Sequence, residues 1–166
     1  MYKFFIHIAI IICCFFSAQN LDAQVYKSAV GARLGWGIRA SYKTFLNEKH
    51  ALELYAGFGG FIGTHLSAGA LYLIHQPIGS VENLNWYYGG GVVANYWSFS
   101  EYGGLSEGYF QVGVRAGAGL DYKFKNAPIN LSVDLLPTFY LIKNGLNGFF
   151  GIGGGGLSVR YVLKDS

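Results

Sequence analysis

The chain is poor in charged residues. Aspartate, glutamate, lysine and arginine make up 13% of its 166 residues, and the formal net charge is only +3. The surface of a water-soluble domain is usually about 25–35% charged. The few cations are also scattered along the chain, which excludes the concentrated basic surface that nucleic-acid binding needs. The composition therefore has too little charge for an ordinary soluble protein.

Cysteine is equally scarce. The only two cysteines lie in the apolar run FFIHIAIIICCFF, which follows a basic start at the N-terminus. Such a run, followed by a small residue, is typical of a secretory signal peptide, and it is shorter than the roughly 20 residues of a transmembrane helix. We predict a signal peptide at residues 1–23, with cleavage after Ala23 or alternatively Ala18, and one exported domain at residues 24–166. That domain contains no cysteine, which excludes disulfides and cysteine-bound metal.

No window of the sequence has the 3.6-residue periodicity of an amphipathic helix. Instead, polar and apolar residues alternate in short runs bounded by glycine, asparagine or proline, as they do in strands. A tight turn at Gly35-Trp36-Gly37 separates the first two runs. With this turn the number of predicted strands is eight, and an even number of strands suits an exported barrel that has both termini on one side of the membrane. The predicted strands lie at residues 26–34, 37–45, 51–59, 64–75, 84–97, 109–124, 129–141 and 150–163.

The stretch YFQVGVRAGAGLDYKF at residues 109–124 has two different faces. Side chains alternate along a strand, so one face is apolar and the other is small and charged. The same separation holds in the other strands, and the remaining charges fall in turns, loops or the C-terminal tail. The charges predicted to share the polar face are Lys27, Arg33, Arg39, Lys43, Glu53, Arg115, Asp121, Lys123, Asp134 and Arg160.

Two kinds of barrel fit this alternation. A soluble carrier of the lipocalin type turns its apolar face inward, whereas an outer-membrane barrel turns it toward lipid. An eight-stranded interior is only just wide enough for ordinary side chains, and the apolar face carries too many rings to fit there. We therefore predict an all-β fold, an eight-stranded antiparallel up-and-down transmembrane β-barrel with its polar face inside. The rings predicted to face lipid are Tyr26, Trp36, Tyr42, Trp86, Tyr88, Tyr96, Phe110, Tyr122, Phe124 and Tyr161.

Three segments, YKSAVGARLGWGIRASYKTFL, NWYYGGGVVANYW and DYKFKNAPINLSVDLLPTF, resemble small Gram-negative outer-membrane β-barrel proteins of the general OmpX and OmpA barrel type. They are most similar to uncharacterised barrels of the Bacteroidetes type, and the resemblance covers nearly the whole exported domain. It implies location in the cell outer membrane, contact with outer-membrane lipid and lipopolysaccharide, and insertion by the outer-membrane assembly machinery. It implies no activity. Strands of such barrels commonly end in an aromatic residue, whereas the last strand here ends at Leu163.

Two groups of residues are predicted in the lumen. Buried charges need partners and a barrel of this size has no open pore, so we expect an ion-pair plug made of Lys27, Arg39, Lys43, Glu53, Asp121, Lys123, Asp134 and Arg160, with His75 as a further partner. Toward the outer mouth, a small anionic or sugar-like ligand could bind among Arg33, His65, Trp97, Arg115, Tyr140 and Phe150. Cations outnumber carboxylates in the lumen, and trapped water or an anion would balance them. The connections 98–108 and 142–149, predicted to be extracellular, are too short for a protein-binding platform.

His65 and Ser67 are the one candidate for catalysis, because they share a face and a nucleophile beside a base can perform acyl transfer. Membrane-embedded lipid A deacylases use such a pair with a glutamate, but no carboxylate completes the pair in this sequence. No metal spacing and no cofactor motif is present. We predict a non-enzymatic monomer with an envelope structural or small-ligand-binding role. A lipid A acyl hydrolase and a narrow channel are the alternatives.

Pro137 lies within the seventh predicted strand, where proline removes a donor from the ladder and a closed barrel has no edge strand to accommodate it. We predict a bulge near Leu136-Pro137 that shifts the facing of the residues after it.

Overall fold

The computed structural model describes residues 25–59, 64–79, 81–100, 106–143, 150–152 and 154–165. No helix in these ranges is long and apolar enough to span a membrane. The predicted signal peptide and the central parts of connections 98–108 and 142–149 lie outside them. The strands are β1 (Tyr26–Gly35), β2 (Gly37–Phe45), β3 (His50–Gly59), β4 (Thr64–Pro77), β5 (Leu84–Ser100), β6 (Ser106–Lys123), β7 (Ile129–Leu135), β8 (Thr138–Lys143), β9 (Phe150–Gly151) and β10 (Gly156–Asp165).

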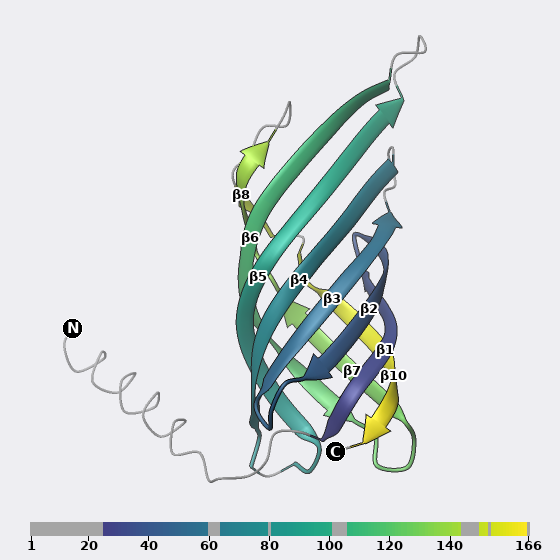
Figure 1. Ribbon diagram of the computed structural model, residues 1–166, viewed down its shortest axis with the longest axis vertical. Coiled ribbons are helices and arrows are strands. Elements are labelled where there is room, and N and C mark those ends of the chain that lie inside the picture. The colour runs from purple at the N-terminus through teal and green to yellow at the C-terminus, as the bar shows by residue number, and fades with distance from the viewer. Residues whose placement is uncertain are drawn as a thin grey trace, which may run out of the picture.

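The strands close into a barrel (Figure 1). Each strand from β1 to β6 pairs antiparallel with the next, and β10 pairs with both β1 and β7. β7 and β8 both pair with β6 and act as one barrel strand, as do β9 and β10 on their other side. The predicted eight-stranded antiparallel barrel is therefore confirmed.

The two ends of the barrel differ. The end with the start of β1 and the end of β10, called the terminal end here, also carries the turns at 46–49, 78–83 and 124–128. At the opposite end, called the loop end, β5 and β6 are the longest strands, with 17 and 18 residues. They rise well beyond the tight β1–β2 turn (Figure 1). The rim of the loop end is therefore slanted.

The alternation of the sequence becomes the two faces of the barrel wall. Large apolar side chains, such as Val92, Val114 and Val133, are exposed on the outside. Eight charged strand side chains are buried in the lumen, because successive residues point to opposite faces of a strand. They are Arg33, Arg39, Lys43, Glu53, Arg115, Asp121, Asp134 and Arg160. The outer rings lie toward the strand ends, as with Tyr161 near the terminal end and Phe110 near the loop end.

The start of β1 departs from the predicted facing. Tyr26 pairs with Asp165 and Ser28 with Lys164, so Lys27 is an extra residue opposite a single step of β10. A bulge of this kind redirects the neighbouring side chains. Tyr26 is consequently buried in the lumen and Lys27 is exposed. The prediction that placed Lys27 in the ion-pair plug and Tyr26 on the outer face is wrong.

The bulge predicted near Leu136-Pro137 does not interrupt the ladder with β6. Leu135 pairs with Ala118 and Thr138 with Arg115, three residues apart on both strands, so the register against β6 continues across Pro137. The Pro137 carbonyl still accepts a hydrogen bond from the Ala116 amide (3.2 Å), and only the donor of that pair is missing.

One irregularity lies after the proline on β8, and another lies on the neighbouring strand that faces residues 134–138. Tyr140 pairs with Gly113 and Ile142 with Val112, so β8 has one extra residue there. A second irregularity lies on the last strand. Gly151 pairs with Thr138 and Gly156 pairs with Asp134, so five residues along the last strand correspond to four along its neighbour. The last strand therefore has one extra residue between Gly151 and Gly156. The bulges thus occur where no ladder donor is missing, and the facing is unchanged across Pro137 itself.

Aromatic rings also occupy the lumen, which the prediction considered too narrow for them. Tyr26, Phe45, Tyr55 and Tyr87 are all buried there. Glycines on the neighbouring strands leave the space. Gly119 pairs directly with Tyr87, and a Cβ at Gly119 would lie 2.7 Å from both Tyr87 Cζ and Asp134 Cβ. The interior therefore holds a few rings because glycines beside some of them have no side chain, as Gly119 does beside Tyr87 and Gly69 beside Tyr55.

Substitution of Gly119 by alanine is expected to lower the free energy of unfolding by about 1–3 kcal/mol, because the added methyl group has no space beside Tyr87 and Asp134. Gly79→Ala is the matched control, since a Cβ there meets nothing within 4 Å; it should change stability by less than about 0.5 kcal/mol. Denaturant unfolding of the two variants measures both values. Equal stability of the two variants would contradict the packing described for the lumen.

Candidate functional site

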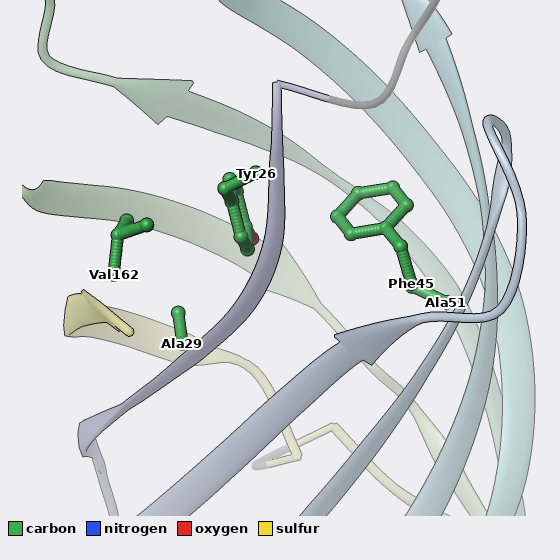
Figure 2. Close-up of a cluster of buried hydrophobic side chains, with 5 residues drawn as sticks. All are labelled: Tyr26, Ala29, Phe45, Ala51 and Val162. Carbon is green, nitrogen blue, oxygen red and sulfur yellow. The ribbon is translucent and has the colours of Figure 1, made fainter. Parts of the chain in front are cut away.

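An apolar cluster lies in the lumen at the terminal end (Figure 2). The rings of Tyr26 and Phe45 meet edge to face, with centroids 5.2 Å apart, and pack with Ala29, Ala51 and Val162. All five side chains are buried. Sequence reasoning did not identify this cluster, although Phe45 shares the parity of the inward residues of β2.

Above this cluster, Asp134 of β7 is the centre of the first charged group. Arg33 of β1 donates to both of its oxygens, from Nη1 at 2.8 Å and from Nη2 at 2.5 Å. The Tyr87 hydroxyl donates to the same carboxylate at 2.7 Å, and the Gly156 amide does so at 3.1 Å. A guanidinium that binds both oxygens of a carboxylate fixes their relative orientation as well as their distance.

Glu53 of β3 is the centre of the second group. Arg160 of β10 donates to it from Nη2 at 2.6 Å, and the Ser41 hydroxyl donates at 2.9 Å. Arg160 also donates from Nε to Ser41 and from Nη1 to Ser132. Arg33 Nη1 lies 3.5 Å from Glu53, so the first two groups are continuous.

Asp121 of β6 is the centre of the third group. The Lys43 ammonium donates to it, as do the Asn130 amide at 2.5 Å and the Tyr26 hydroxyl at 3.2 Å. His75 Nε2 lies 3.8 Å from the same carboxylate, and its ring stacks on Tyr87 with centroids 5.0 Å apart. The third group thus joins the charged network to the apolar cluster below it.

The three groups bring together most of the predicted plug residues: Arg39 and Lys123 have other places, and Lys27 lies outside the lumen. Arg39 is buried on β2 opposite Arg33 and lines a separate cavity, and Lys123 is half-buried on β6 opposite Asn130. Arg33, predicted for the outer mouth, belongs to the network instead. The sequence assigned these side chains to one face correctly but could not assign the partners, because each pair joins strands that are distant in the chain.

A cavity of about 220 Å³ opens above the network toward the loop end. It brings together four of the six residues predicted to form an outer binding site, namely His65, Trp97, Arg115 and Tyr140. Its complete lining is Trp36, Arg39, His65, Asn95, Trp97, Arg115, Tyr140 and Gly154.

Phe150 is not part of this cavity. Its side chain is 64% exposed, and it pairs with Phe139, which is also on the outer face. The extra residue between Gly151 and Gly156 explains the error. It reverses the alternation, so Phe150 points outward although the even-numbered residues of β10, such as Ser158 and Arg160, point inward. The predicted inward position of Phe150 is therefore wrong.

His65 and Ser67 share the lumen face, as predicted, but they are not hydrogen-bonded to each other. His65 Nε2 lies 3.4 Å from Asn95 Oδ1, and its ring stacks on Trp97 with centroids 3.8 Å apart. Ser67 Oγ makes no hydrogen bond to any residue that the structure describes. Glu53, the carboxylate of β3, pairs with Leu71, four residues along β4 from Ser67, and it is bonded to Arg160 and Ser41. Within the described ranges, no group of three or more His, Cys, Asp or Glu side chains could hold a metal ion.

The chain matches no protein-family model and no curated protein. Among solved structures, it is similar to the N-terminal β-barrel domain of Pseudomonas aeruginosa OprF, with a TM-score of 0.61 and 17% sequence identity. The likeness covers 83% of this chain and 98% of that domain. At this level of identity the likeness shows the fold, an eight-stranded β-barrel.

Breaking the Arg33–Asp134 pair tests the role of the network in stability. Arg33→Met should lower the free energy of unfolding by about 3–5 kcal/mol, because it leaves a buried carboxylate without its cation. The double variant with Asp134→Asn should recover part of this loss. Lys125→Gln is the control, since Lys125 and its partner Glu82 are exposed; an exposed pair contributes roughly 0–1 kcal/mol. An Arg33→Met protein as stable as the Lys125→Gln protein would contradict the account.

Proposed function

We propose that the protein spans the outer membrane of a Gram-negative cell as a small β-barrel and serves there as a structural component of the envelope, with a lumen closed to ions. We also infer that it belongs with the small outer-membrane barrels that its three quoted segments resemble, including their Bacteroidetes-type members. The observation that carries the proposal is the reversal of the usual distribution of polarity: apolar side chains outside and a paired charge network inside.

The outer face supports the membrane position. Among the strand side chains that the structure describes, Lys27 near the terminal rim is the only charged one outside the lumen. The belt between the rims is built of residues such as Val92, Val114 and Val133, and larger rings such as Tyr96 and Tyr161 lie toward its borders. Transmembrane barrels have such an apolar band, about 25 Å tall, between two aromatic girdles. Lipid and lipopolysaccharide are the partners that this surface fits.

The lumen supports closure to ions. The cluster around Tyr26 and Phe45 closes the terminal end, and the network of Asp134, Glu53 and Asp121 crosses the barrel above it. An ion could pass only by displacing side chains that neutralise one another. A structural role therefore fits better than a narrow channel, and the separate hydrogen bonds of His65 and Ser67 give no support to acyl hydrolysis.

Planar-bilayer recordings test this proposal. The refolded protein should insert without producing stepwise conductance, because no continuous polar path remains in the lumen. A variant with Arg33, Glu53, Asp134 and Arg160 replaced by alanine, and with Tyr26 and Phe45 replaced by alanine as well, removes two cations, two carboxylates and the two rings of the apolar cluster, and it should conduct. Reproducible conductance steps from the unmodified protein would identify a channel instead. Recovery of the folded protein from the periplasm without detergent would contradict the membrane position itself.

A further inference from the structure

Arg39 and Arg115 carry charge that no described residue balances. They are 3% and 5% exposed, and no carboxylate among the described side chains lies within 4 Å of either guanidinium. The three lumen carboxylates are bonded to other cations deeper in the barrel, namely Arg33, Arg160 and Lys43. A buried charge without a partner is strongly unfavourable. Two adjacent positive charges on the wall of one cavity therefore favour the binding of a negatively charged group there.

The hydrogen-bonding groups of the two arginines are also incompletely used. Arg39 Nη1 and Arg115 Nε are buried without an acceptor in the part of the chain that the structure describes. Arg115 Nη1 donates to the Tyr55 hydroxyl at 2.7 Å, which holds this guanidinium in place. Both side chains line the 220 Å³ cavity. The planar fork of a guanidinium suits the oxygens of a phosphate or carboxylate.

The remaining wall of the cavity is suited to a ring. The stacked rings of His65 and Trp97 are nearly parallel, with an angle of 11° between them, and they form a flat aromatic side. Asn95 donates to the Tyr140 hydroxyl at 3.2 Å and contributes polar atoms beside them. A cavity of about 150 Å³ can hold benzene. The larger volume here therefore has space for one six-membered ring and a small anionic group.

From these contacts, we propose that the outer cavity binds a phosphate monoester carried on a single ring, with the phosphate between Arg39 and Arg115 and the ring beside Trp97. A phosphate monoester carries a charge of about −1.5 to −2 at neutral pH, which matches two guanidiniums better than one carboxylate does. The inference goes beyond the structural role, and it is independent of closure to ions: a closed barrel can fail to bind, and a conducting one can bind.

Titration calorimetry of the folded protein in detergent micelles tests the site with phenyl phosphate as the probe. Saturable binding with one site per chain is expected. Benzoate should bind more weakly, and benzyl alcohol, which has the ring without the charge, should not bind. Arg39→Gln and Arg115→Gln should each weaken phenyl phosphate binding by about tenfold or more, because each removes hydrogen bonds between charged groups. Lys125→Gln, which removes an exposed cation far from the lumen, should change the affinity by less than about twofold.

The outcomes decide the proposal even if one variant is unstable. Arg115→Gln removes the hydrogen bond to Tyr55 and could fail to fold, whereas Arg39 makes no hydrogen bond to the described residues. Arg39→Gln and the comparison of phenyl phosphate with benzyl alcohol are then sufficient. Absence of saturable binding to the unmodified protein would overturn the proposal, as would equal binding of benzyl alcohol or unchanged affinity in Arg39→Gln.

Discussion

Arg33 of β1 and Asp134 of β7 meet in the lumen over the strand between them, β10, although their positions in the chain differ by 101. In a barrel of eight strands, the interior is only wide enough for side chains, so a charge placed there is cut off from water. It must find an opposite charge on another strand, and the partner must lie at the same height in the barrel. This requirement links the register of β1 to that of β7, and the pairs of Glu53 with Arg160 and of Asp121 with Lys43 link β3 to β10 and β6 to β2. The charge pairs therefore fix how the strands are arranged around the barrel.

Packing inside the barrel depends on the same pairs. Tyr87 donates to Asp134 and occupies the space that Gly119 leaves, and Tyr55 accepts from Arg115 beside Gly69. Each of these glycines thus leaves space for one particular ring, and the charge network holds that ring in place. The glycines also relieve crowding in a curved strand. The terminal end, where this network meets the rings of Phe45 and Tyr26, is filled without charge. The lumen accordingly changes from apolar to paired charge to unbalanced positive charge between the terminal end and the loop end.

Most of the fold was predictable because strand alternation is local. The opposite faces of Val114 and Arg115 follow from their position in one strand, and the eight strands follow from such patterns together with the turn glycines. The errors at Tyr26, Lys27 and Phe150 have one cause, because an extra residue in a ladder changes the facing and becomes visible only when the partner strand is known. Parity predicted four of the eight residues that line the outer cavity. The division of the arginines between the network and the cavity was not predictable, because it depends on contacts between distant strands.

The central claim is that the apolar face of the wall meets lipid and the charged face fills the lumen. Spin labels at single cysteines test it most directly, since the only natural cysteines lie in the predicted signal peptide. Labels placed one at a time from Phe110 to Leu120 of β6, with the protein in lipid bilayers, should show accessibility to oxygen that alternates with a period of two. The maxima should fall at even-numbered positions such as Val114 and the minima at odd-numbered positions such as Arg115. Maxima at the odd positions, or equal accessibility at all positions, would contradict the account.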